Sequence, residues 1–424
     1  MIDIKLIRQD REAIEKLLRT KEPDVDLSSI CEMDEEIRGL KTHNEQLKAK
    51  RNEASKQIGQ LKRDGKDTSD IMSQVSVFGD EIRSNDHKIH ELETKLTSEL
   101  SQLPNLPLDE VKISQNVEDN VILKEWGQKR EFGFEPKNHM ELGESLNLFD
   151  FKRGAKITGS GWPVYRGMGA RLEWALINYM LDVNIKNGFE MFMVPLAVKR
   201  ETIFASGQLP KFEDQQFHIT DKDYDFFLVP TAEVPLNGLH MDEILTEEEL
   251  PLKYCAYTPC FRREAGAAGE KERGLIRIHQ FNKVEMFCYS TPEQSMEVHA
   301  QMCRNAEEIL EGLGLHYRNA LLVTGDMSFA SAYTVDIEVW LPGQDRYYEV
   351  SSLSNCTDYQ ARRSLTRFRR KGEKPEFVHT LNGSGLATSR LLVSLIENNQ
   401  NEDGTVNVPE VLQERLGGIK VLTP

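Results

Sequence analysis

Hydrophobic residues near the start of the chain recur at alternating spacings of three and four, the pattern of an a/d heptad seam. The first run comprises Ile30, Met33, Ile37, Leu40, Leu47, Ala54, Ile58 and Leu61, with Asn44 and Arg51 at intervening seam positions. After a polar break at 64–67, the second run comprises Ile71, Val75, Phe78, Ile82, Asn85, Ile89, Leu92 and Leu96. Two equal seams with a short break between them predict a helical hairpin.

Pairing residues whose numbers sum to about 132 keeps the two seams in register, and it aligns Leu47 with Asn85. Helices of roughly 35 residues would form an antiparallel coiled-coil arm about 50 Å long. We interpret the polar seam residues as register devices rather than catalytic groups. A dimerisation or spacer coil is the alternative role for such an arm.

The rest of the chain predicts a mixed α+β domain. A linker with two prolines follows the second helix, so we expect an N-terminal domain at 1–103, a linker at 104–115 and a second domain at 116–424. Helical periodicity covers 169–187, and strand-like runs follow at 190–198, 226–230, 253–262, 275–288, 335–341 and 346–352. Because these strands are mostly separated by turns rather than by crossover helices, we expect an antiparallel sheet flanked by helices.

Composition supports two domains and a cytoplasmic location. The 424 residues exceed one typical core, and no apolar run approaches the ~18 residues of a membrane span, so no membrane partner is expected. The N-terminus looks amphipathic and does not resemble a signal peptide, which has a basic stem followed by an apolar core. Although the formal net charge is −16, residues 41–66 hold eight bases and only three acids. A basic excess near the tip of the arm favours contact with an extended polyanion.

The six cysteines are scattered and form no C-x-x-C pair. Neither a structural zinc site nor a disulfide framework is therefore expected. The chain also has no G-x-x-x-x-G-K-[ST] loop, and its G-x-G pairs lack the third glycine of a dinucleotide fingerprint. Any ATP site must be built by other means.

The stretch CFRREAGAAGEKERGLIRIHQF places cations around a Gly/Ala-rich loop between two strand-like runs. Period-2 alternation puts Arg277, His279, Phe281, Lys283 and Glu285 on one face of the second run. A solvated face is the plain interpretation. However, Phe281 could stack on a nucleobase, and Arg262 could hold a phosphate through two hydrogen bonds. Loop residues Arg263, Glu264, Lys271 and Arg273 would add adaptable polar contacts.

Three ordered segments resemble the motifs of the class II aminoacyl-tRNA synthetases, specifically the seryl-tRNA synthetase family. They are GFEMFMVPLAVKRE for motif 1, FRREAGAAGEKERGLIRIHQFNKVE for motif 2 and LNGSGLATSRLLVSLIENNQ for motif 3. The resemblance covers nearly the whole chain. It implies a six- to seven-stranded antiparallel catalytic sheet and a homodimer with motif 1, including Pro195, at its interface.

The resemblance also implies an ATP-dependent ligase that activates L-serine to seryl-adenylate and then charges serine tRNA, with selenocysteine tRNA an open second substrate. Arg262, Glu349 and Arg390 would be catalytic, with the two arginines on the α- and γ-phosphates. Glu349 and Ser352 would bind Mg²⁺ with ATP. The implied ATP-binding residues are Arg262, Arg263, Glu264, Ile278, Phe281, Glu349, Val350, Ser351, Ser352 and Arg390.

The implied L-serine-binding residues are Thr231, Ala232, Glu233, Glu285, Thr380, Asn382 and Ser384. Two carboxylates would hold the ammonium. The basic segment at 362–374, near motif 3, would contact the tRNA acceptor end, although a solvated charged face is its alternative. Two other functions stay open at this point. One is a class II paralogue that activates an amino acid for a carrier protein or another tRNA, and the other is a non-catalytic tRNA-binding scaffold.

Overall fold

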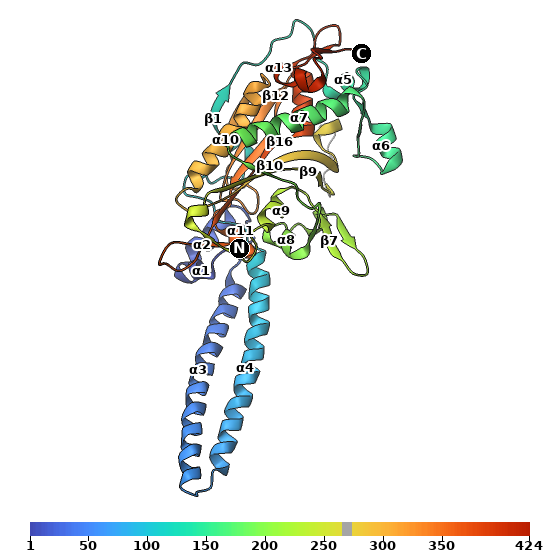
Figure 1. Cartoon of the computed structure of the whole chain (residues 1–424). Helices are drawn as coiled ribbons and strands as arrows, with labels where there is room; N and C mark the ends of the chain where they lie inside the picture. The colour runs from blue at the N-terminus through green and yellow to red at the C-terminus, as the bar shows by residue number, and fades with distance from the viewer. Residues whose placement is uncertain (265–273) are drawn as a thin grey trace. The chain divides into compact units, whose positions relative to one another are not determined.

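A computed structural model describes residues 1–264 and 274–424 (Figure 1). Lys271 and Arg273 lie outside the described residues. The chain divides into two compact units, one of residues 2–103 and one of residues 104–424 together with Met1. No helix among the described residues is long and apolar enough to cross a membrane.

The smaller unit consists of helices. It contains α1 (Ile4–Gln9), α2 (Arg11–Arg19), α3 (Ser28–Arg63) and α4 (Ser69–Ser101). The predicted hairpin is confirmed, because α3 and α4 pack against each other along the heptad positions. Ile37, Leu47 and Ala54 of α3 and Ile82 and Ile89 of α4 are buried, while most of the intervening residues are exposed.

Asparagines in the seam are hydrogen-bonded across the two long helices. Asn85 Nδ2 donates to Asn44 Oδ1 at 2.9 Å, and Asn44 Nδ2 donates to Asp86 at 2.8 Å. Asn85 was expected to align with Leu47, and its hydrogen bond is to Asn44, about one helical turn earlier in α3. Asn44 is only 2% exposed, and a buried amide must find a hydrogen-bonding partner, which Leu47 cannot provide.

The larger unit is built on an eight-stranded sheet. Its strands run in the order β1 (Val121–Trp126), β11 (Tyr317–Leu321), β12 (Tyr333–Leu341), β13 (Arg346–Asn355), β16 (His379–Ala387), β10 (Gln280–Ser290), β9 (Leu252–Phe261) and β4 (Glu190–Phe192). All neighbours are antiparallel except β4 and β9, which are parallel. The predicted antiparallel sheet is confirmed, but it has more strands than the six to seven expected.

Alternating residues of the central strands enter two hydrophobic cores. Val284 and Met286 of β10 belong to the core that contains α7 (Met168–Lys186), α10 (Ser295–Gly312) and α12 (Thr388–Asn398). Phe287 and Tyr289 belong to a second core with residues of α9 (Glu233–Gly238) and α11 (Tyr359–Ser364). The sheet therefore has helices on both faces.

Short elements complete the larger unit. The helices are α5 (His139–Ser145), α6 (Phe151–Ile157), α8 (Arg200–Ala205) and α13 (Glu410–Gln413). The strands are β2 (Phe149–Asp150), β3 (Val164–Tyr165), β5 (Ala197–Lys199), β6 (His218–Thr220), β7 (Asp225–Leu228), β8 (Ile244–Thr246), β14 (Arg367–Arg369), β15 (Glu376–Phe377), β17 (Val406–Asn407) and β18 (Val421–Leu422).

Two predicted strand boundaries are wrong. The run at 275–288 begins as a 3₁₀ turn at Gly274–Ile276, and the strand itself starts only at Gln280. Leu275 and Ile276 are apolar because they fill the core, not because they alternate in a sheet. The run at 190–198 divides into β4 and β5 around Pro195, whose missing N–H cannot join a sheet ladder.

Candidate functional site

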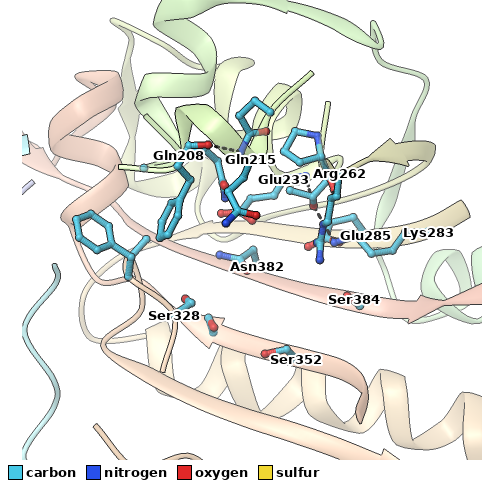
Figure 2. Close-up of a pocket in the computed structure, with 18 of the residues that line it drawn as sticks. Gln208, Gln215, Glu233, Arg262, Lys283, Glu285, Ser328, Ser352, Asn382 and Ser384 are labelled. Carbon is cyan, nitrogen blue, oxygen red and sulfur yellow. Dashed lines mark hydrogen bonds and ion pairs between the residues drawn. The ribbon is translucent and has the colours of Figure 1, made fainter. Parts of the chain in front are cut away.

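Most of the predicted site residues line two adjoining cavities of the larger unit. One cavity, of about 500 Å³, is shown in Figure 2, and the other has about 460 Å³. Predicted residues lining the first are Thr231, Glu233, Arg262, Glu264, Glu285, Glu349, Ser352, Asn382 and Ser384. The second shares Arg262, Glu264, Glu349 and Ser384 with the first, and adds Ile278, Phe281 and Arg390. Segments far apart in sequence thus contribute to one continuous site.

Arg262 is held at the end of β9 next to the aromatic ring of β10. Its backbone N–H donates to His279 O at 2.9 Å, and its Nε donates to Pro230 O at 3.3 Å. The guanidinium carbon lies 5.1 Å from the centroid of the Phe281 ring. Antiparallel pairing of Phe281 with Cys260 fixes this approach. A planar cation and an aromatic face are therefore presented together to the cavity.

Arg390 approaches the second cavity from α12. Its Nη1 donates to the Glu349 carboxylate at 3.0 Å and to the Glu349 backbone oxygen at 3.1 Å. The guanidinium carbon also lies 5.0 Å from the centroid of the Tyr348 ring. Because β13 holds both Tyr348 and Glu349, this strand orients the arginine. The side chain of Arg390 is 26% exposed and therefore accessible to an anion in the cavity.

Two carboxylates and one ammonium form the polar end of the first cavity (Figure 2). Lys283 Nζ lies 2.5 Å from Glu285 Oε2 and donates to Thr231 Oγ1 at 2.8 Å. Burial and then the nearby Glu285 carboxylate raise the pKa of Glu233 to about 7, while Lys283 opposes the shift. Glu233, Glu285 and Lys283 therefore carry one excess negative charge when both carboxylates are ionised, and the nearby Arg262 partly offsets it.

Local backbone structure aims these side chains into the cavity. Thr231 Oγ1 accepts the Glu233 N–H at 3.2 Å, which fixes the start of α9. On the sheet, Glu285 of β10 pairs with Ser384 of β16 in the strand register. Opposed residues on adjacent strands point to the same face, so Glu285 and Ser384 reach the cavity together.

Several predicted residues lie outside the cavity walls. Ala232, Val350, Ser351 and Thr380 are buried. Ser351 Oγ donates to the Ser384 backbone oxygen at 2.5 Å, and Thr380 Oγ1 donates to the Gln360 side chain at 2.7 Å. Arg263 is exposed, and its backbone N–H donates to Gln215. These residues can support the site through others, but the structure does not place their side chains on its surface.

Other residues line the cavities without having been assigned a role from sequence. Lys283 and Arg277 were on the predicted polar face, so period-2 alternation contained the signal for both. Arg277 Nε donates to Glu264 at 2.6 Å. Gln215 and Ser328 come from segments with no recognisable motif, so no local pattern could have identified them.

The basic segment at 362–374 is partly used inside the protein. Arg363 is buried and donates to Leu209 O and to the Tyr359 hydroxyl, each at 2.8 Å. Arg370 forms ion pairs with three carboxylates, those of Glu247, Glu293 and Glu376. Three bases of the segment are exposed, namely Arg369, Lys371 and Lys374.

Comparisons with known proteins agree with this geometry. Residues 1–107 match the family described as the seryl-tRNA synthetase N-terminal domain, and residues 212–399 match the tRNA synthetase class II core domain (G, H, P, S and T). The chain is 50% identical to a serine–tRNA ligase of Chlamydia felis, with 100% of this chain and 99% of the relative covered.

Solved structures show the same fold over the full length. A seryl-tRNA synthetase from Pyrococcus horikoshii complexed with ATP is 37% identical with a TM-score of 0.95, and both chains are covered completely. A cytoplasmic serine–tRNA ligase from Naegleria fowleri in complex with AMP is 29% identical with a TM-score of 0.90, with 100% of this chain and 99% of that chain covered.

Proposed function

Because the chain belongs to the seryl-tRNA synthetase family and is a serine–tRNA ligase, we propose that its two adjoining cavities hold ATP and serine side by side. The observation that carries the proposal is that Arg262 and Arg390, from motifs 2 and 3, line one cavity. Similarity over the whole chain favours a ligase over a carrier-protein paralogue or a scaffold.

ATP would occupy the cavity lined by Phe281 and the two arginines. Phe281 would cover the adenine face, while Glu264 and the Ile278 backbone contact its edge. Arg262 would hold the α-phosphate and Arg390 the γ-phosphate. The serine carboxylate attacks the α-phosphate and pyrophosphate leaves, so no protein nucleophile is needed. Positioned cations stabilise the charge that develops during this displacement.

A divalent cation fits beside the triphosphate. The candidate ligands are the Glu349 carboxylate and the Ser352 hydroxyl, both hard oxygen donors suited to Mg²⁺. Within residues 1–264 and 274–424, no group of three or more His, Cys, Asp or Glu residues forms a complete metal site. We infer that the protein supplies few ligands and that ATP phosphates and water complete the coordination. The cation would offset phosphate charge.

Serine would occupy the first cavity. Its ammonium would face Glu233 and Glu285, and its hydroxyl would be read by Glu285, Asn382 and Ser384. Alanine would leave these polar groups unpaired, at roughly 1 to 3 kcal/mol for each group. Threonine must be excluded by shape. Neither Ala232 nor Thr380 contributes a side chain to this cavity wall, so any role they have would be indirect.

The helical arm would bind the tRNA, and the exposed bases Arg369, Lys371 and Lys374 would contact its acceptor end. Charging of serine and selenocysteine tRNAs side by side tests whether both are substrates.

We also place the protein in the cytoplasm, as a homodimer. Exposed apolar side chains of motif 1 and α7 favour a dimer, since Met193 is 92% and Trp174 is 55% exposed.

Replacing Arg390 by alanine should reduce serine-dependent ATP–pyrophosphate exchange by about 10²-fold, because a cation that stabilises phosphate charge is lost. Binding of tRNA, measured by filter retention, should stay within about twofold. Arg153→Ala is the matched control, because that side chain is 72% exposed on α6. Unchanged exchange in Arg390→Ala would reject the γ-phosphate role.

Deleting residues 38–94 should leave serine activation near the parent rate and abolish most tRNA charging, because the arm carries the local basic excess. The matched variant for this deletion keeps the full arm but changes Lys48, Lys50 and Arg51 to glutamine. It should weaken tRNA binding and flatten its salt dependence. Equal charging by parent and truncated proteins would refute the arm's role.

Changing Trp174 to glutamate should shift the protein from dimer toward monomer, because a buried charge opposes an apolar interface. Analytical ultracentrifugation over a concentration series measures the shift. Tyr224→Glu is the control, because Tyr224 is equally exposed, at 56%, but lies between β6 and β7. A monomeric parent, or equal dimer affinity in both variants, would contradict the proposed interface.

A further inference from the structure

Gln360 lies behind the proposed serine cavity and joins three parts of the larger unit. Its side chain comes from α11 and is fully buried. Nε2 donates to Glu233 Oε1 at 2.6 Å and to Ser206 O at 2.9 Å. Oε1 accepts the Thr380 hydroxyl at 2.7 Å. Gln360 is not among the residues that line the cavity, and the lining residue that it bonds is Glu233.

The bonding partners fix the orientation of the Gln360 amide. A backbone carbonyl such as Ser206 O can only accept a hydrogen bond, so the nitrogen of the amide must face it. The same nitrogen faces Glu233, and Glu233 Oε1 is therefore held as an acceptor. Turning the amide over would place its oxygen against the Ser206 oxygen and leave both without a donor, which is costly in a buried site.

The charges around Glu233 make this orientation important. Glu285 and Lys283 act on it from β10, and Arg262 acts from the end of β9. The other neighbours are the neutral amide of Gln360 on α11, with the neutral Thr380 hydroxyl of β16 behind it, and the Ser206 carbonyl after α8. A hydrogen bond donated to a carboxylate favours its charged form.

We propose that Gln360 is a positioning residue for serine binding, which keeps the Glu233 carboxylate aimed at the substrate ammonium and favours its ionised form. Thr380 then acts by fixing Gln360 rather than by touching the serine hydroxyl. This inference rests on the proposed serine site. When serine binds, its ammonium offsets the excess negative charge, and a proton held by Glu233 before binding is released to solvent.

The pH dependence follows from this assignment. The pKa of Glu233 is raised to about 7, mainly by burial and then by Glu285, so its ionised fraction increases as the pH rises through 7. kcat/KM for serine should therefore increase over the same range and level off above it. Without the Gln360 amide, the carboxylate loses a bond that lowers its pKa, and the rise should move to higher pH.

The test is serine-dependent ATP–pyrophosphate exchange by the full chain over a range of pH. Gln360→Met keeps the length of the side chain but removes its donor, and Gln360→Glu places a second carboxyl against Glu233. We expect about a tenfold higher KM for serine at pH 7, with KM for ATP within about twofold. The pH at which kcat/KM for serine reaches half its plateau should rise in both variants, and it should rise more in Gln360→Glu.

Two further variants keep the result decisive. Thr380→Val removes the hydroxyl that orients Gln360 and is a milder change if the Gln360 variants fold poorly. It should raise KM for serine only a few-fold and should move the pH midpoint in the same direction. Gln413→Met is the control, because Gln413 of α13 donates to Val408 O and does not line either cavity.

The Glu233→Gln variant tests the proposed ammonium site separately from the positioning role of Gln360. If it leaves KM for serine unchanged, the proposed ammonium site is wrong. If it raises KM for serine while the folded Gln360 and Thr380 variants keep the parent KM and pH midpoint, the site stands and the positioning role of Gln360 is overturned. If the Gln360 variants raise KM for serine without moving the pH midpoint of kcat/KM, that role is also overturned, because a simple loss of packing would give the same result.

Discussion

The proposed serine end of the site depends on an uneven balance of buried charge. Glu233 and Glu285 face one cavity with Lys283 as the adjoining ammonium. Burying an excess carboxylate is costly unless a counter-charge arrives, and this cost raises the pKa of Glu233 to about 7. A ligand with an ammonium completes the balance. In the proposed function, such a pocket would favour an amino acid before any contact reads its side chain.

Residues of motifs 2 and 3 meet around a second buried carboxylate, that of Glu173 on α7. Its Oε1 accepts Asn282 Nδ2 at 2.9 Å and also accepts the Thr388 hydroxyl. Asn282 follows Phe281 in β10, and Thr388 starts α12 shortly before Arg390. One side chain therefore ties the α7 helix to the strand and the helix that present the proposed ATP contacts. Burial raises the pKa of Glu173 to about 7, while its two donors oppose the shift.

Patterns that repeat along the chain predicted structure well. The heptad seam predicted the arm because a two-helix rod buries only its a and d positions. Residues that share a face of one strand, such as Lys283 and Glu285, could also be grouped by alternation. The motif resemblance brought together Arg262 and Arg390, whose meeting in one cavity could not have been derived from spacing alone.

The remaining features depend on tertiary contacts. Leu275 looked like a strand residue because an apolar residue that fills a core resembles one that alternates in a sheet. Thr380 directly precedes motif 3, yet its hydroxyl donates to Gln360 behind the wall. Arg363 looked like part of a basic surface, but the backbone oxygens it satisfies come from a distant segment. No local pattern distinguishes these cases.

The most direct test of the charge balance is isothermal titration calorimetry of serine binding at pH 7, in buffers with different ionisation enthalpies. Because the pKa of Glu233 is raised to about 7, part of the protein carries this proton at pH 7, and serine binding should release it. Glu233→Gln should abolish this release. A binding enthalpy that does not vary with the buffer, or net proton uptake by the parent protein, would contradict the account.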